Sequence, residues 1–149
     1  EICACLVGSE MCKETDYYQT IATLIIGMTA SLLIYTLFPN AQSMRPTQFT
    51  HDNIFTQVIS MLYATDTDTN VLPSIHVFNS LAIHAGLCRY ATIHKQKIWR
   101  NGSFVLCLLI CMSTLFLKQH SFLDVAAAIV LFMIVSWITN ILFRKRTTK

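Results

Sequence analysis

The chain contains three long apolar segments that are almost free of charge, and these constrain its fold more than any other feature. Residues 20–38 form a run of nineteen residues without a charged side chain. A hydrocarbon layer about 30 Å thick requires about 20 helical residues, because each residue adds about 1.5 Å. Residues 122–143 are long enough, with Asp124 near one end, and residues 103–117 are slightly short. The sequence therefore predicts an all-α fold, a multi-pass integral membrane helical bundle.

A fourth span is predicted over residues 74–90, where His76, Asn79 and His84 dilute the apolar character. Polar side chains in a spanning helix usually face protein or a water-filled cavity, so this segment is expected to line an interior. The four full spans are expected to form one membrane-embedded domain over the whole chain. Residues 1–8 are expected to be the tail of a preceding helix, in a chain truncated at its N-terminus.

The few charged residues are placed as in a membrane protein. They make up 13% of the chain, about half of the roughly 25% typical of soluble domains. When the four spans are threaded, Arg45 and Lys118 fall on one face, and the other nine Lys and Arg residues fall on the opposite face, which the positive-inside rule makes cytoplasmic. The nine are Lys13, Arg89, Lys95, Lys97, Arg100, Arg144, Lys145, Arg146 and Lys149. Such a distribution sets topology and forms no basic binding face, so no nucleic-acid partner is expected.

The outer face is predicted to carry a long loop, residues 39–73, and a short loop, residues 118–121. Within the long loop, residues 54–64 have apolar residues at helical spacing. This pattern predicts a short amphipathic helix that lies at the membrane interface.

Three polar stretches that are distant in sequence converge on this outer face: Arg45, residues 73–76 and residues 113–124. Pro73-Ser74 is typical of a helix start, because proline pre-sets the backbone and serine caps the first amides. A helix N-terminus presents N–H groups and a partial positive charge that attract anions. His76, in that first turn, is therefore expected to lie close to a bound anion.

The stretch 113–124 adds a histidine and a carboxylate four residues apart, His120 and Asp124, which share one face of a helix. A neighbouring carboxylate fixes the tautomer of an imidazole and stabilises the charge that it gains. Arg45 can fork onto phosphate oxygens, and Lys118 can act as a point charge. Together these residue types indicate phosphoryl transfer without a metal or other cofactor. The structural alternative is that the pair only caps a helix.

Two other polar features receive structural interpretations. His84, two turns below His76, is interpreted as a hydrogen-bonded or cavity-lining histidine. Asp66, Asp68 and Asn70 begin like a calcium-binding loop, but valine occupies the sixth position, where the loop requires glycine. Loop-shaping turns are therefore favoured there.

The motifs resemble those of the type 2 phosphatidic acid phosphatase superfamily. PSIH at residues 73–76 and S-T-x5-H-x3-D at residues 113–124 are similar to the family signatures PSGH and SR-x5-H-x3-D, in the same order. FPNAQSMRP at residues 38–46 is similar to K-x6-RP, the signature that precedes these two in the family. Together with DTDTNVLPSIH at residues 66–76, it resembles a bacterial branch. The resemblance covers about residues 20–143. It implies a six-helix membrane fold, of which this chain would hold four full spans.

The resemblance also implies roles for individual residues. His120 matches the nucleophile that accepts the phosphoryl group, Asp124 its orienting acid, and His76 the general acid that protonates the leaving oxygen. The positions expected to bind the substrate phosphate are Arg45, Ser74, Ile75 through its backbone, Ser113, Thr114 and Lys118.

Two positions depart from the family pattern. Phe38 stands where the family has lysine, and Thr114 stands where it has arginine. Lys118, two residues before His120, is the candidate replacement for one of these cations. The losses leave room for a relative that transfers lipid phospho-headgroups to an alcohol, or for a catalytically inactive relative.

The resulting expectation is an integral membrane phosphatase that hydrolyses a lipid phosphate or diphosphate, of phosphatidate or polyprenyl type, through a phosphohistidine intermediate. Its partners are the lipid phosphate substrate and the surrounding membrane lipids. Its expected location is a bacterial plasma membrane, with the active site on the extracytoplasmic face.

Overall fold

The computed structural model describes residues 2–41, 45, 53–65, 69–93 and 95–147. It contains five helices: α1 (Ile2–Leu37), α2 (Ile54–Thr65), α3 (Ile75–Ile93), α4 (Lys97–Phe116) and α5 (Phe122–Thr147). The described residues contain no β-sheet, and one isolated antiparallel bridge joins Ala41 to Thr69. The all-α prediction is confirmed.

Three of these helices are long and apolar enough to cross a membrane. Their candidate spans are Glu14–Leu37 in α1, Lys97–Phe116 in α4 and Phe122–Arg144 in α5. The fourth predicted span corresponds to α3, a helix of 19 residues, but it is not among the helices that meet this criterion. The reason is the one expected from its sequence, since His76, Asn79 and His84 lower its hydropathy.

Residues 2–8 belong to the same continuous helix as the first span. Within the described chain, no break separates them from this span, so the boundary expected after residue 8 is not seen there. The helix predicted over residues 54–64 is present as α2.

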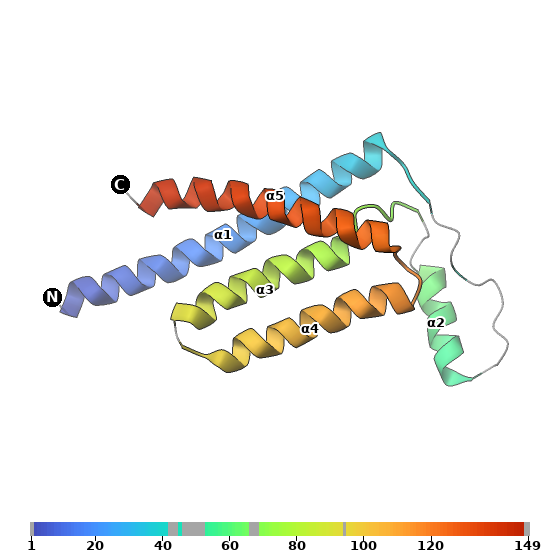
Figure 1. The fold of residues 1–149 in the computed structure, drawn as a ribbon, viewed down its shortest axis with the longest axis horizontal. Helices are drawn as coiled ribbons and strands as arrows, with labels where there is room; N and C mark the ends of the chain where they lie inside the picture. Colours follow the sequence, from blue (N-terminus) through green and yellow to red (C-terminus); the bar gives the residue numbers. More distant parts are fainter. Residues whose placement is uncertain (1, 42–44, 46–52, 66–68, 94, 148–149) are drawn as a thin grey trace.

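Helices α1, α3, α4 and α5 lie side by side, and α2 crosses one end of the bundle (Figure 1). Helix α3 is the centre of the arrangement, because it packs against α1, α4 and α5. The buried core lies where α3 meets α5, and its members are Val77, Phe78, Ala82, Ala128 and Val135. The helix with the most polar sequence thus occupies the position with the most protein neighbours.

Glycines allow α1 and α3 to approach closely. A Cβ atom added to Gly27 of α1 would lie 1.8 Å from the ring of Phe78, and one added to Gly86 of α3 would lie 2.6 Å from Thr20 Oγ1. Small residues at helix contacts are the usual means of tight packing in membranes, where the hydrophobic effect does not drive helices together. These two positions therefore fix the spacing of α1 and α3.

Polar side chains join α1 to α5. The hydroxyl groups of Thr23 and Thr139 lie 3.0 Å apart, and both side chains are buried. One turn away, the side-chain amide of Gln19 donates a hydrogen bond to that of Asn140. Interhelical hydrogen bonds of this kind each contribute about 0.6 kcal/mol on average within a membrane.

Candidate active site

The turn that ends α4 places His120 at the end of the bundle where α2 lies. The N–H of Lys118 donates to the carbonyl of Leu115 at 3.0 Å, and the N–H of Gln119 donates to that of Thr114 at 3.1 Å. This pair of bonds is a Schellman motif, which requires a residue with positive φ just after the helix. Lys118 adopts that conformation, with φ of 51°. The observed role of Lys118 is therefore to turn the backbone so that Gln119 and His120 follow in the right direction.

Asp124 lies beside His120 and also caps α5. Its Oδ2 atom accepts a 2.6 Å hydrogen bond from the N–H of Ser121, and the Ser121 hydroxyl accepts a 3.3 Å bond from the N–H of Asp124. This reciprocal arrangement is a capping box. The same Oδ2 atom lies 3.8 Å from Nδ1 of His120. The carboxylate therefore stabilises the start of α5 while facing the imidazole, so the capping and orienting interpretations are compatible.

His76 reaches His120 from the first turn of α3. The two imidazole rings have centroids 6.0 Å apart and meet edge to face. Ser74 brings them together, because its backbone N–H donates a 3.3 Å bond to the carbonyl of Asp124. The Ser74 side chain is fully buried, and its hydroxyl faces the N–H of Val77 at 3.5 Å.

A small polar cavity of about 130 Å³ lies beside the two histidines; we call it the histidine cavity. The long loop supplies one wall, and Asn40 shapes that loop: its Oδ1 atom accepts hydrogen bonds from the N–H groups of Val71 and Leu72, at 2.7 and 3.1 Å. The described residues that line the cavity are Tyr35, Arg45, Thr69, Asn70, Val71, Ile75, His76, Gln119 and His120.

Four of the residues expected at the site line this cavity: Arg45, Ile75, His76 and His120. Asp124 lies behind His120. The other four expected phosphate-binding residues, Ser74, Ser113, Thr114 and Lys118, are not among the lining residues.

The reasons differ for these four. The buried hydroxyl of Thr114 donates to the carbonyl of Cys111 at 2.9 Å, so it is turned towards its own helix. Ser113 and Lys118 are exposed. The Ser74 hydroxyl is directed at the N-terminus of α3. These four residues lie outside the lining of the histidine cavity, and their phosphate-binding roles stay predictions.

Sequence reasoning missed Tyr35 and Gln119, and it interpreted Asn70 as part of a turn within the stretch that resembles the bacterial branch. Asn70 does have a turn conformation, with φ of 59°, and it also lines the cavity. The hydroxyl of Tyr35 donates to the carbonyl of Pro73, a contact between residues 38 positions apart that no local motif signals. Gln119 is buried and precedes His120 directly, so its position in the short loop at residues 118–121 was the available signal.

Arg45 is held against α2. Its guanidinium carbon lies 5.0 Å from the ring centroid of Tyr63, a cation–π geometry. Arg45 is the sole Lys or Arg among the described residues that line the histidine cavity. Pro46, Asp66 and Asp68, which belong to the motifs of the long loop, lie outside the described residues.

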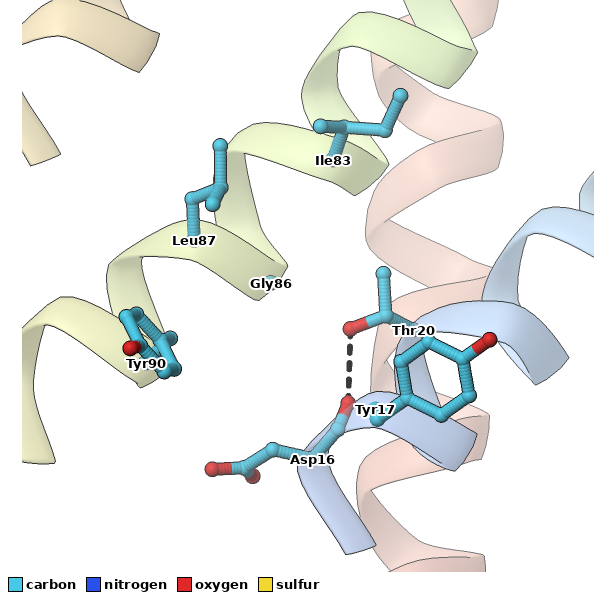
Figure 2. A pocket seen from close by; sticks show the side chains of 7 residues that line it. All are labelled: Asp16, Tyr17, Thr20, Ile83, Gly86, Leu87 and Tyr90. Carbon is cyan, nitrogen blue, oxygen red and sulfur yellow. Dashed lines mark hydrogen bonds between the residues drawn. The ribbon is translucent and has the colours of Figure 1, made fainter. Parts of the chain in front are cut away.

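A second cavity of about 260 Å³ lies between α1 and α3; we call it the apolar cavity. Figure 2 shows its lining, with Asp16, Tyr17 and Thr20 from α1 facing Ile83, Gly86, Leu87 and Tyr90 from α3. The Thr20 hydroxyl donates to the carbonyl of Asp16 at 2.8 Å and accepts from the guanidinium of Arg89 at 3.1 Å. None of its described lining residues is a histidine or a cysteine.

His84 has the structural role expected of it. Its Nδ1 atom lies 2.9 Å from the hydroxyl of Ser103, which itself donates to the carbonyl of Arg100 at 3.0 Å. Since that hydroxyl hydrogen points to the carbonyl, Nδ1 is assigned as the donor. The described part of the chain has no group of three His, Cys, Asp or Glu side chains that could hold a metal ion.

The fold and the site thus define a membrane-type helical bundle with paired histidines and one arginine at a polar cavity. The family model of the PAP2 superfamily matches residues 23–148. The chain therefore belongs to the PAP2 superfamily, whose members are generally phosphatases. No curated protein and no solved structure matches the chain.

Proposed function

We propose that the protein is a membrane phosphatase that hydrolyses a lipid phosphate or diphosphate at the histidine cavity. The observation that carries the proposal is the meeting of His76 and His120, 6.0 Å apart, in a cavity lined by Arg45. Membership in the PAP2 superfamily supports a phosphatase-type enzyme. The cavity lies at the end of three helices that are long enough to cross a membrane, where a lipid headgroup can reach it.

The proposed reaction begins with attack by His120 on phosphorus. Nδ1 of His120 faces the carboxylate of Asp124 at 3.8 Å, so Nε2 is the nitrogen that forms the bond to phosphorus. The bond from phosphorus to the lipid oxygen breaks, and protonated His76 gives its proton to that oxygen. The products of this step are the lipid alcohol and phosphohistidine at position 120.

Water then attacks the phosphohistidine while His76 takes one of its protons. The bond between phosphorus and Nε2 breaks, inorganic phosphate leaves, and both histidines return to their starting states. Arg45 would bind the phosphate oxygens throughout both steps. The Asp124 carboxylate would stabilise the positive charge that develops on the His120 ring.

The test is release of inorganic phosphate by the purified protein from a panel of lipid phosphates and diphosphates. His120→Ala should abolish release, by about 10³-fold or more, as expected when a nucleophile is lost. An acid-labile phosphoryl adduct should be trapped on the unaltered protein and not on this variant. Full activity of His120→Ala would overturn the mechanism, and release from no substrate in the panel would overturn the function.

A second candidate function is transfer of a lipid phospho-headgroup to an alcohol. The observation that favours it is the low positive charge of the site, since Phe38 and Thr114 replace two family cations and neither lines the cavity. A phosphodiester carries one negative charge, whereas a phosphate monoester carries nearly two at pH 7. A phospholipid labelled at phosphorus and offered together with alcohol acceptors separates transfer from hydrolysis. Label on the acceptor indicates transfer, whereas label in the free headgroup phosphomonoester indicates hydrolysis of the diester.

A further inference from the structure

Tyr63 makes two contacts that join the histidine cavity to α2. Its ring lies under the guanidinium of Arg45, with 5.0 Å between the guanidinium carbon and the ring centroid. Its hydroxyl donates a 2.7 Å hydrogen bond to the carbonyl of Leu117. Arg45 lies at a bend and not in a helix, so contacts of this kind help to determine where its charge lies.

The second contact reaches the turn that carries His120. Leu117 is the C-cap of α4, and the next residue, Lys118, begins the Schellman turn that leads to Gln119 and His120. One rigid side chain therefore touches the cation at one end and the turn before His120 at the other. An aromatic ring with a hydrogen-bonded hydroxyl has little conformational freedom, so its position sets the spacing between Arg45 and His120.

The opposite side of α2 is apolar and exposed. Between 64% and 75% of the surface of each of Ile54, Phe55, Val58 and Met61 is accessible, and α2 contains no charged residue. Tyr63 follows Ile54 by nine residues, about two and a half helical turns, and so lies on the other side of the helix. The helix thus presents an apolar side outwards and Tyr63 towards the site.

The position of α2 indicates what covers its apolar side. The helix crosses the end of the bundle, next to the turn between α4 and α5 (Figure 1). Helices α4 and α5 both contain candidate membrane spans, so this turn lies where the hydrocarbon layer ends. An uncharged amphipathic helix at this level matches the boundary between headgroups and acyl chains.

We propose that Tyr63 is a positioning residue that couples the insertion of α2 into the lipid leaflet to the placement of Arg45 beside His120. The proposal rests on the proposed function, because it names the device that prepares the same phosphate site. When α2 lies in the leaflet, Tyr63 holds the guanidinium over the cavity. When α2 leaves the leaflet, Tyr63 moves with it, and the guanidinium of Arg45 is no longer held over the cavity.

The first experiment separates the ring of Tyr63 from its hydroxyl. With a water-soluble phosphate monoester as substrate, Tyr63→Leu should raise KM about 5- to 30-fold, the equivalent of a cation–π contact of about 1–2 kcal/mol. The value of kcat should stay within about twofold, because binding that is equal in the ground and transition states affects KM alone. Tyr63→Phe keeps the ring and should recover most of the loss. Tyr18→Leu, at an exposed tyrosine of α1, is the matched control and should change neither value.

The second experiment tests the coupling to lipid. The double variant Phe55→Ser, Met61→Ser removes two side chains from the apolar side without touching Tyr63. In vesicles of phosphatidylcholine and phosphatidylglycerol it should raise KM for the same soluble ester. Combining it with Tyr63→Leu should add little, since residues that act through one contact are not additive. If the increases in KM of the double variant and of Tyr63→Leu multiply when the changes are combined, the coupling is overturned. An unchanged KM in the double variant or in Tyr63→Leu would also overturn it.

The affinity for orthovanadate distinguishes failure of this proposal from failure of the proposed function. Vanadate resembles phosphate and reports on the cavity without turnover. If the protein hydrolyses no ester but binds vanadate, and Tyr63→Leu weakens that binding by the same 5- to 30-fold, the function fails and the coupling stands. If the protein hydrolyses esters and Tyr63→Leu leaves both KM and vanadate affinity unchanged, the coupling alone fails. If the unaltered protein neither hydrolyses an ester nor binds vanadate, both fail.

Discussion

The histidine cavity is smaller than the apolar cavity, but it is the one that holds the reactive side chains. The first has a volume of about 130 Å³ and the second about 260 Å³. The larger one lies between the bodies of α1 and α3, beside the close approach of Gly86 to Thr20 (Figure 2). The smaller one exists because helix ends and the long loop bring Arg45, His76 and His120 together. In this bundle, the cavity between helix bodies is lined mainly by apolar side chains, whereas the polar and reactive side chains meet at the helix ends.

The largest effect that should separate the two cavities is the loss of His76. His76→Ala should lower kcat/KM by about 10²- to 10⁴-fold, the usual contribution of a general acid or base. His84→Ala, two turns along the same helix and away from the histidine cavity, should change kcat/KM by less than about threefold. The loss in His76→Ala should shrink with an aryl phosphate, whose leaving group needs no proton. If His76→Ala and His84→Ala lower kcat/KM equally, α3 has only a structural role.

The next largest effect should come from Arg45. Arg45→Ala should lower kcat/KM by about 10- to 100-fold, because one charge-assisted hydrogen-bond donor to phosphate contributes about 1.5–3 kcal/mol. Arg45→Lys should recover part of the loss, since it keeps the charge without the planar fork. Steady-state kinetics with a soluble phosphate ester checks both. If Arg45→Ala behaves like the unaltered protein, phosphate is bound elsewhere.

A change at the apolar cavity should affect stability and not activity. The Cβ of Gly86→Ala would meet Thr20 Oγ1 at 2.6 Å and Cγ2 at 2.8 Å, so α1 and α3 must shift. Overpacking of this kind costs about 1–3 kcal/mol. Thermal unfolding in detergent should show the destabilisation, and kcat/KM below the unfolding temperature should stay within about twofold. A large loss of activity in a folded protein would show that the two cavities are coupled.

The smallest expected effect concerns the contact between α1 and α5. Thr139→Val keeps the shape of a fully buried side chain and removes its hydrogen bond to Thr23. The free energy of unfolding should fall by about 0.6 kcal/mol, and activity should not change. A measured change above about 2 kcal/mol would mean that the polar contacts of α1 and α5 act as one network.

Periodicity and hydropathy predicted most of the fold. The apolar runs predicted α1, α4 and α5, and the amphipathic spacing predicted α2. What these signals could not show is that residues 2–8 continue into α1, because the short polar stretch that follows them is compatible with either a helix or a break. The polar side chains of α3 indicated that it lines an interior, but hydropathy could not show which helices pack against it, because burial by protein and burial by lipid select similar apolar side chains.

The site was predictable where chemistry depends on backbone motifs. His76 and His120 sit in a helix start and a helix stop, and both elements leave local signatures. The motif match did not distinguish the side chains that face the cavity from those that do not. Thr114 and Ser74 satisfy nearby backbone groups instead, a competition that is usual for short hydroxyl side chains. Tyr35 and Tyr63 act through contacts with carbonyls 38 and 54 positions away, and a single sequence carries no signal for such pairs.

The central place of α3 has a consequence for how the protein reaches its membrane. This helix begins at Ile75, bears the polar side chains of His76, Asn79 and His84, and packs against three other helices. Taken alone, a segment of this composition should partition weakly from the translocation channel into lipid. Its insertion is therefore expected to wait for α4, which follows after a connection of only three residues, so that the two helices leave the channel as a pair.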